Sequence, residues 1–250
     1  MLLVKGKLTI KNATLVGSDG FGLVALGKGT VLNLESVKMQ NAGRCLDVMS
    51  GATVNIDKST SLETTAGNCT VFVTSDDIAK AKLNVDGTVK CSIENYAISG
   101  NGTDKIGSDV VINEGAVVTS AQDSAIYQPQ GGTLVINGGT IEGKDGIYQK
   151  SGKITVNGGT IKGTGNAEYK YNGNGSYAMG HGIVVEFANY PAGLPKLTTV
   201  GGTIISEQKT DAIGYAVSPK YTGGKDLETL KAENVVVGEG TVLTGKVQEQ

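Results

Sequence analysis

The sequence lacks tryptophan, and among its 250 residues it has one histidine, His181, and one arginine, Arg44. Proteins that bind nucleic acid usually gather basic residues on one face, with arginine for bidentate contacts. A net charge of −2 and a single arginine do not fit that pattern, so we expect no nucleic-acid partner. One histidine without a second coordinating cluster argues against zinc. Calcium, which binds several oxygen ligands, is compatible with the composition, but no motif indicates it, and we expect no cofactor.

Long hydrophobic runs are also lacking. No uncharged apolar run approaches the roughly 20 residues that a membrane-spanning helix needs, so we expect no membrane insertion. Met1–Val4 is too short for the apolar part of a signal peptide and runs directly into patterned sequence. The first residues also give no sign of the cap that an exposed end of a stack needs. We therefore expect one domain over residues 1–250, as a fragment or processed part of a longer chain with other domains.

Glycine, in contrast, is abundant at 38 residues, and it marks an internal repeat. Residues 134–141 (LVINGGTI) recur 20 residues later as 154–161 (ITVNGGTI). Weaker copies begin at residues 8, 32, 54, 83, 110, 197 and 235. Most spacings between copies are 20 to 29 residues, which suits one solenoid turn of three short strands. The spacings of 43 and 38 residues after 154 predict loops that project from one place on the C-terminal half.

Apolar residues alternate within each copy, as in Leu134 and Ile136, and a period of two indicates a β-strand. Asn-Gly-Gly then predicts a turn, because glycine adopts positive φ without steric cost. Helix signals are sparse: Lys225–Ala232, in the last long loop, has the pattern of about two helical turns.

A small residue followed by an aliphatic one recurs once per coil, and we call the small positions the small-residue ladder. Stacked coils lie about 4.8 Å apart, so a crowded position must stay small in every coil. The second position is aliphatic in seven of the eight pairs and is expected to point inward. The pairs are Gly22-Leu23, Cys45-Leu46, Cys69-Thr70, Ala97-Ile98, Ala125-Ile126, Gly146-Ile147, Gly182-Ile183 and Ala212-Ile213.

These features predict an all-β, right-handed, single-stranded parallel β-helix of about nine coils. The pattern resembles the pectin-lyase-like superfamily, and in particular the Gly-Gly-Thr-rich stacks of bacterial surface adhesins and carbohydrate-binding proteins. The resemblance covers nearly the whole chain. It implies the fold but not one activity, because this fold carries lyases, hydrolases, esterases and non-catalytic adhesins alike.

Gly180-His181-Gly182 is similar to a motif of polygalacturonase-like hydrolases, and Asp76-Asp77 to that family's paired aspartates. The two motifs are about 100 residues apart here instead of about one coil, and the family's Asn-Thr-Asp and Arg-Ile-Lys are missing. Gly182-Ile183 is equally explained as one pair of the ladder series. We therefore favour a structural interpretation of this motif.

The residue before each ladder position defines an outward row. Asp145, His181 and Asp211 are consecutive in this row, so a carboxylate–imidazole–carboxylate array would suit acid–base chemistry or ligand binding. A solvated charged face explains the same residues, and we favour it. If the chain is an enzyme, these three are its candidate catalytic residues. The full row reads Phe21, Arg44, Asn68, Tyr96, Ser124, Asp145, His181 and Asp211.

Tyr127 and Tyr148 occupy equivalent positions in adjacent coils, beside Gln128 and Gln149. Outward-facing rings with neighbouring amides would suit sugar rings, which have apolar faces and polar rims. Aromatic packing that stabilises the stack explains them equally well.

The long loop after Ile161 carries three tyrosines, Tyr169, Tyr171 and Tyr177, among Asn and Gly. Loops that project from a rigid stack often carry function. This loop and the one that follows Pro191 are expected to border Asp145, His181 and Asp211, which makes that region the expected binding site.

The cysteines are three, an odd number, so a disulfide framework is not indicated. Cys45 and Cys69 are close enough in the expected register to be bonded, but small buried thiols are the favoured interpretation.

Three functions remain open from the sequence. The favoured one is a non-catalytic, extracellular or cell-surface adhesin-like module that binds a polysaccharide or a cell-surface glycan. The second is a polysaccharide lyase or glycoside hydrolase acting on an acidic polysaccharide, with Asp145 and Asp211 about 9–10 Å apart along the axis. The third is a structural stalk or spacer.

Overall fold

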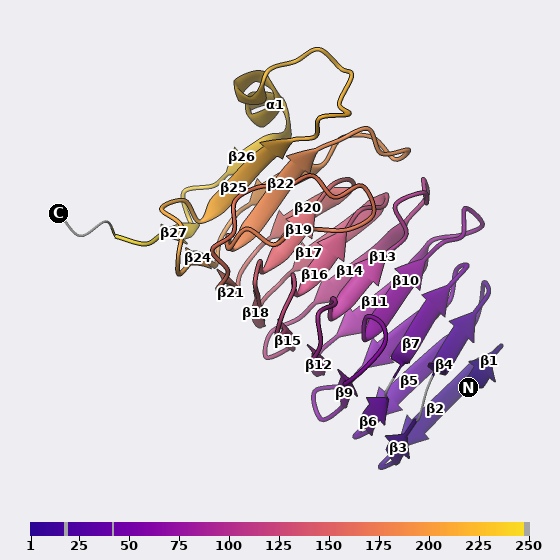
Figure 1. The fold of residues 1–250 in the computed structure, drawn as a ribbon. Helices are drawn as coiled ribbons and strands as arrows, with labels where there is room; N and C mark the ends of the chain where they lie inside the picture. Colours follow the sequence, from indigo (N-terminus) through magenta and orange to yellow (C-terminus); the bar gives the residue numbers. More distant parts are fainter. Residues whose placement is uncertain (18–19, 42, 248–250) are drawn as a thin grey trace.

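The computed structural model describes residues 1–17, 20–41 and 43–247. These residues form three parallel sheets of nine strands each, with very little helix. Each coil contributes one strand to each sheet, so the chain winds nine times around one axis (Figure 1). The fold is the right-handed parallel β-helix that the repeat predicts.

The strands follow one another in the order sheet A, sheet B, sheet C. Sheet A contains β1 (Leu2–Val4), β4 (Phe21–Leu26), β7 (Arg44–Met49), β10 (Val71–Thr74), β13 (Ile98–Gly100), β16 (Ile126–Gln128), β19 (Ile147–Gln149), β22 (Ile183–Phe187) and β25 (Ile213–Val217). Sheet B contains β2 (Lys7–Lys11), β5 (Val31–Glu35), β8 (Thr53–Ile56), β11 (Ala81–Val85), β14 (Ser108–Ile112), β17 (Gly132–Ile136), β20 (Lys153–Val156), β23 (Lys196–Thr199) and β26 (Val235–Val237). Sheet C contains β3 (Thr14–Val16), β6 (Lys38–Asn41), β9 (Ser61–Thr64), β12 (Thr88–Cys91), β15 (Val117–Ser120), β18 (Thr140–Gly143), β21 (Thr160–Gly163), β24 (Thr203–Ser206) and β27 (Val242–Thr244).

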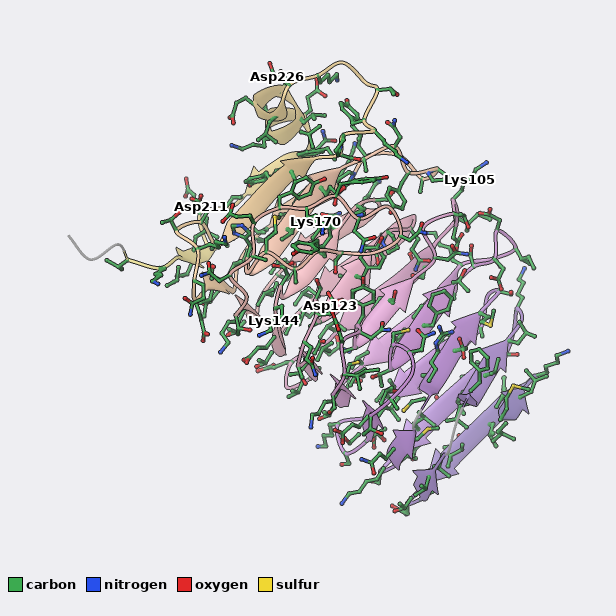
Figure 2. The ribbon with its side chains drawn as sticks, viewed as in Figure 1. Lys105, Asp123, Lys144, Lys170, Asp211 and Asp226 are labelled. Carbon is green, nitrogen blue, oxygen red and sulfur yellow. The ribbon has the colours of Figure 1, made fainter. Side chains whose placement is uncertain are left out.

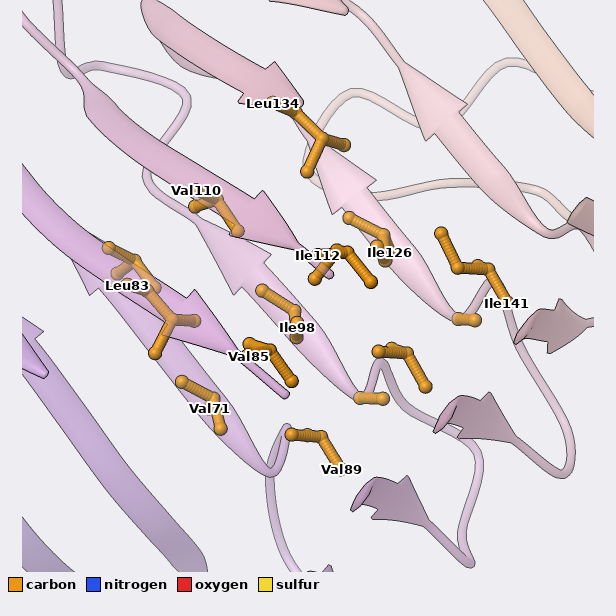
Figure 3. Close-up of a cluster of buried hydrophobic side chains, with 14 of the residues drawn as sticks. Val71, Leu83, Val85, Val89, Ile98, Val110, Ile112, Ile126, Leu134 and Ile141 are labelled. Carbon is orange, nitrogen blue, oxygen red and sulfur yellow. The ribbon is translucent and has the colours of Figure 1, made fainter. Parts of the chain in front are cut away.

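The strand register confirms the repeat at every copy. Leu134 pairs with Ile154, and the first residues of the nine copies form one continuous column in sheet B. Inward aliphatic side chains from all three sheets fill the interior, and Figure 3 shows part of this cluster, from Val71 to Ile141. Because each coil buries its aliphatic residues against the next, the core is a continuous column along the axis.

The small-residue ladder is confirmed with one correction, in the fourth coil, which contains β10. Leu46 pairs with Val71 and Val71 pairs with Ile98, so Thr70 and Val71 take the places expected for Cys69 and Thr70. The inward position is therefore aliphatic in all eight coils, and Cys69 replaces Asn68 in the outward row. The error was one residue in the length of a corner, which a repeat pattern does not constrain.

Crowding explains why the ladder is small. A Cβ atom on Gly182 would lie 2.6 Å from Cγ2 of Ile204 in sheet C and 2.9 Å from the carbonyl oxygen of Ile161. A Cβ atom on Gly146 would lie 2.6 Å from Cγ2 of Ile161. The ladder thus lies where sheet A approaches the aliphatic side chains of sheet C.

The turns between sheets B and C are short, and asparagine amides connect them from coil to coil. Asn157 donates to Asn137 at 3.0 Å, and Asn137 donates to Asn113 at 3.2 Å. Gly139 and Gly159, the second glycines of two Asn-Gly-Gly turns, have φ of 80° and 86°, as the sequence predicts. These hydrogen bonds and turns fix the coil register at this corner.

The cysteines are buried thiols. Cys45 and Cys91 are inaccessible and Cys69 is 1% exposed, and none forms a disulfide. Burial raises the pKa of the Cys69 thiol to about 12, which keeps the thiol protonated. The expectation of small buried thiols is confirmed.

The long loops leave the stack at two corners instead of the one expected. Residues 164–182, which we call the insertion, connect sheet C to sheet A between β21 and β22. Residues 188–195 and the segment with helix α1 (Leu227–Asn234) connect sheet A to sheet B. The helix confirms the pattern in Lys225–Ala232, and Asp226 caps it by accepting from the Thr229 amide at 2.8 Å.

These loops define two edges of sheet A. The amino margin lies before the strands, where Asp211 precedes β25, and the carboxyl margin lies after them, where Lys105 follows β13. Asp211 and Lys105 lie on opposite sides of the stack in Figure 2. The insertion begins at the amino margin and crosses the outer face of sheet A towards the carboxyl margin (Figure 1).

Candidate ligand-binding cavity

Asp145, at the amino margin, is inaccessible to solvent and binds main chain. Its carboxylate accepts hydrogen bonds from the amides of Met179 (3.1 Å), Gly180 (2.6 Å) and His181 (2.9 Å). These amides end the insertion, so Asp145 fastens the loop to the stack. Burial raises the pKa of Asp145 to about 7, and the three amide donors oppose that shift.

His181 and Asp211 meet through a main-chain atom and not through a carboxylate. The Nδ1 atom of His181 lies 2.7 Å from the carbonyl oxygen of Asp211, whose side chain is exposed. The imidazole covers Gly214, where a Cβ atom would overlap the ring. Burial lowers the pKa of His181. The three residues are neighbours in the row as predicted, but their side chains do not form the carboxylate–imidazole–carboxylate array.

Asp76 and Asp77 lie far from His181. They follow β10 at the carboxyl margin, whereas His181 precedes β22 at the amino margin, four strands along sheet A. Both aspartates have positive φ, 50° and 53°, and Asp77 accepts from the amide of Lys105 at 2.8 Å. Asp76-Asp77 is therefore a turn, and the structure does not bring the hydrolase-like motifs together.

Tyr127 and Tyr148 are paired in register, as predicted, but they lie beneath the insertion. Tyr148 is inaccessible and Tyr127 is 5% exposed, so the expected exposed two-tyrosine face is not present. Tyr127 stacks on Tyr96 with ring centroids 4.8 Å apart, and Met179 of the insertion packs against the cluster. The amides of Gln128 and Gln149 donate to main-chain carbonyls of the following corner, so they bind the stack itself.

A cavity of about 580 Å³ lies at the carboxyl margin, in the size range of small-molecule sites. Four loops line it: residues 101–103 after β13, residues 171–174 of the insertion, residues 188–191 after β22, and residues 218–220 after β25. Its walls carry both aromatic rings and polar side chains. The lining residues are Phe72, Gly100, Asn101, Gly102, Thr103, Tyr127, Lys150, Tyr171, Gly173, Asn174, Glu186, Ala188, Asn189, Tyr190, Pro191, Ser218 and Lys220.

A buried ion pair forms part of the cavity wall. Lys150 and Glu186 are each 1% exposed, and the Nζ atom of Lys150 lies 3.4 Å from Oε2 of Glu186. Tyr148 donates to the same oxygen at 2.6 Å, and Tyr169 donates to Oε1 of Glu186 at 3.4 Å. Lys150 also donates to the carbonyl oxygen of Asn172 at 2.6 Å. The charge of Glu186 is thus compensated by one ammonium and two phenols.

The electrostatics of this pair follow from burial. Desolvation lowers the pKa of Lys150, and the charge of Glu186 opposes that shift. Burial, and then the charge of Glu186, raise the pKa of Tyr148, so the phenol stays protonated and remains a hydrogen-bond donor. The ammonium lies 6.0, 5.7 and 5.8 Å from the ring centroids of Tyr127, Tyr148 and Tyr190, an arrangement that favours its charged form.

Sequence reasoning missed Lys150 and Glu186, although one signal was present. Glu186 interrupts the apolar stretch Ile183–Phe187 at a position where its neighbours are all buried. A charged residue in such a stretch requires a partner, because an unpaired buried charge is costly. The partner lies 36 residues earlier, in the preceding coil, and no local pattern identifies it.

Within residues 1–17, 20–41 and 43–247, no group of three or more His, Cys, Asp or Glu side chains is placed to hold a metal ion. In the same ranges, no helix has the length and apolarity to cross a membrane.

No protein-family model, curated protein or solved structure matches this chain. The expected resemblance to pectin-lyase-like proteins and surface adhesins thus has no match behind it, and the structure shows the parallel β-helix fold.

Proposed function

We propose that this chain is a non-catalytic glycan-binding module of a secreted or cell-surface protein, and that the cavity at the carboxyl margin is its binding site. The observation that carries the proposal is the composition of the cavity wall. The rings of Tyr171 and Tyr190 are half-buried, and the side chains of Thr103 and Asn174 are exposed at the same opening. Sugars present apolar faces to aromatic rings and hydroxyls to amides, so these groups are complementary to a glycan.

The carboxylates of the site also favour binding over hydrolysis. Hydrolysis by the common mechanisms uses two carboxylates that face the glycosidic bond. Glu186 is the one carboxylate among the described residues that line the cavity, and it is bound to Tyr148 and Lys150. Asp145 is inaccessible and binds three amides, so it is not available to a substrate.

The test is a glycan array followed by calorimetry with the oligosaccharides that bind. We expect Tyr171→Ala or Tyr190→Ala to weaken binding at least tenfold, which corresponds to about 1.4 kcal/mol. Tyr177→Ala is the matched control, because Tyr177 belongs to the same insertion but does not line the cavity. If neither neutral nor acidic glycans bind, the proposal is overturned, and a structural spacer becomes the favoured function. Equal losses in all three variants would place the site elsewhere.

The position of Lys150 on the cavity wall favours a second candidate, a polysaccharide lyase. Burial lowers the pKa of Lys150, and a general base must be deprotonated near the working pH. Opposed to this, the ammonium is 1% exposed and is shared between Glu186 and the Asn172 carbonyl. Incubation with uronate polysaccharides, monitored by the ultraviolet absorbance of unsaturated products, distinguishes the two. Turnover that is lost in Lys150→Arg would replace the binding proposal with the lyase.

The location outside the cell is part of the same proposal and has its own test. In cells that express the natural protein, we expect the chain either on the cell surface, where protease treatment of intact cells removes it, or in the medium. Complete protection in intact cells, with digestion after lysis, would contradict it.

A further inference from the structure

We infer that Lys150 is the positioning residue of this cavity: its ammonium holds the insertion in place over the opening. The inference rests on the proposed function for what the cavity binds, but its structural claim can be tested without any ligand.

The insertion is fastened firmly at its two ends and in its second half. At its start, the amides of Thr164 and Gly165 donate to the carbonyl oxygen of Lys144 at 3.1 and 2.9 Å. At its end, Asp145 accepts the three amides described above. Between these points, the hydroxyl of Ser176 donates to Asp123 at 2.7 Å. All these contacts lie towards the amino margin and away from the cavity.

The part over the cavity has far less support. Asn172, Gly173 and Asn174 are exposed. Among the described residues, two hydrogen bonds join residues 171–174 to the rest of the protein, one from the stack and one from the loop after β22. One is the 2.6 Å bond from Lys150 to Asn172, and the other is a 3.4 Å bond from the Tyr190 hydroxyl to the carbonyl oxygen of Gly173. The lysine bond is shorter and charge-assisted, so it is the stronger of the two.

The surroundings of Lys150 explain why a lysine serves this purpose. A desolvated ammonium is costly unless its donors are used, and it has three. Glu186 takes one direction and Asn172 takes another, while the tyrosine rings fill the remaining space. The ion pair is anchored in β22 of the rigid stack. The length of the lysine side chain therefore sets how far residues 171–174 stand from the cavity floor.

Loss of this bond should release residues 171–174 without unfolding the stack, because local opening follows the local density of contacts. Trypsin reports this opening through Lys170, an exposed residue of the insertion in front of sheet A (Figure 2). The single variant Lys150→Met would leave Glu186 buried without a cation and could prevent folding. The double variant Lys150→Met/Glu186→Gln removes the bond to Asn172 without leaving a buried charge.

We expect the double variant to be cleaved after Lys170 at least tenfold faster than the wild type, while hydrogen exchange in β20 changes less than twofold. Glu186→Gln alone keeps the bond from Lys150 to Asn172, and the amide oxygen of the glutamine still accepts from the ammonium, so this variant should be cleaved at the wild-type rate. Lys150→Arg keeps a cation at this position and should be cleaved much more slowly than the double variant. The inference is overturned if the double variant is cleaved at the wild-type rate, if Glu186→Gln is cleaved as fast as the double variant, or if exchange rises equally in β20.

The outcome for the proposed function is separate. If a glycan binds the wild type, its affinity should fall in the double variant in proportion to the opening of the insertion, with Glu186→Gln much less affected. If no glycan binds, the proposed function fails, and the cleavage rates still decide whether Lys150 holds the insertion.

Discussion

At the amino margin of sheet A, Asp145 and His181 bind main chain, whereas at the carboxyl margin Lys150 and Glu186 line a cavity. The carboxylate of Asp145 accepts hydrogen bonds from three amides, and the ring of His181 is hydrogen-bonded to a carbonyl oxygen. Lys150 and Glu186 compensate each other beside open space. The difference shows that reactive residue types in a row do not make a site. What matters is whether they face a volume that a ligand can enter.

Asp145→Ala should have the largest effect on stability. It leaves the amides of Met179, Gly180 and His181 without their acceptor in a buried place, and we expect a loss of about 3 to 4 kcal/mol in the free energy of unfolding. Chemical denaturation measures this loss. Asp211→Ala is the matched control, because it is the same residue type in the same row with an exposed side chain. Similar losses in both variants would contradict the division between the two margins.

Gly182→Ala should come next. Its Cβ atom would lie within 3 Å of Ile204 and of two main-chain carbonyl oxygens. The strands that carry these carbonyl groups cannot move far without breaking their hydrogen bonds. We expect a loss at the upper end of the roughly 1 to 3 kcal/mol that overpacking costs. The melting temperature measures the effect. An unchanged melting temperature would remove the steric basis that we give for the small-residue ladder.

The pH dependence of stability tests the environment of Asp145. Its pKa in the fold, about 7, lies above the unfolded value near 3.9, so the folded state binds the proton more tightly. The stability that this group contributes is complete below the unfolded pKa and is lost as the pH rises through about 7.

The comparison is made against Asp145→Asn, which keeps the neighbouring groups Asp123 and His181. The lowered pKa of His181 acts in the opposite direction, with stability lost as the pH falls, and it is present in both proteins. From pH 5 to pH 8, the stability of the wild type relative to Asp145→Asn should fall by about 2.6 kcal/mol. A constant or rising difference would show that the carboxylate is ionised in the fold at pH 5.

His181→Ala should have the smallest effect. The half-buried ring covers Gly214 and makes one hydrogen bond to main chain, so we expect a loss of less than about 1 kcal/mol. Glycan affinity should be unchanged, because His181 lies at the other margin from the cavity. A tenfold loss of affinity in this variant would show that the glycan binds at the amino margin.

The sequence by itself determined the stack. Alternating aliphatic residues, Asn-Gly-Gly turns and small residues recur with each coil, and stacked coils make equivalent positions neighbours in space. From this equivalence, the column from Leu8 to Val235 and the pairing of Tyr127 with Tyr148 were predicted correctly. The one-residue shift at Cys69 marks where this reasoning weakens, since a corner can gain a residue without disturbing the strands.

The tertiary structure alone decided where a ligand could enter. The insertion has no repeat, so no pattern predicts that it crosses sheet A, buries Tyr148 and binds Asp145 through its amides. The pairing of Lys150 with Glu186 likewise depends on which side chains the loops shield from water. Periodicity encodes the contacts between coils, whereas the path of a long loop depends on contacts between residues that no period relates.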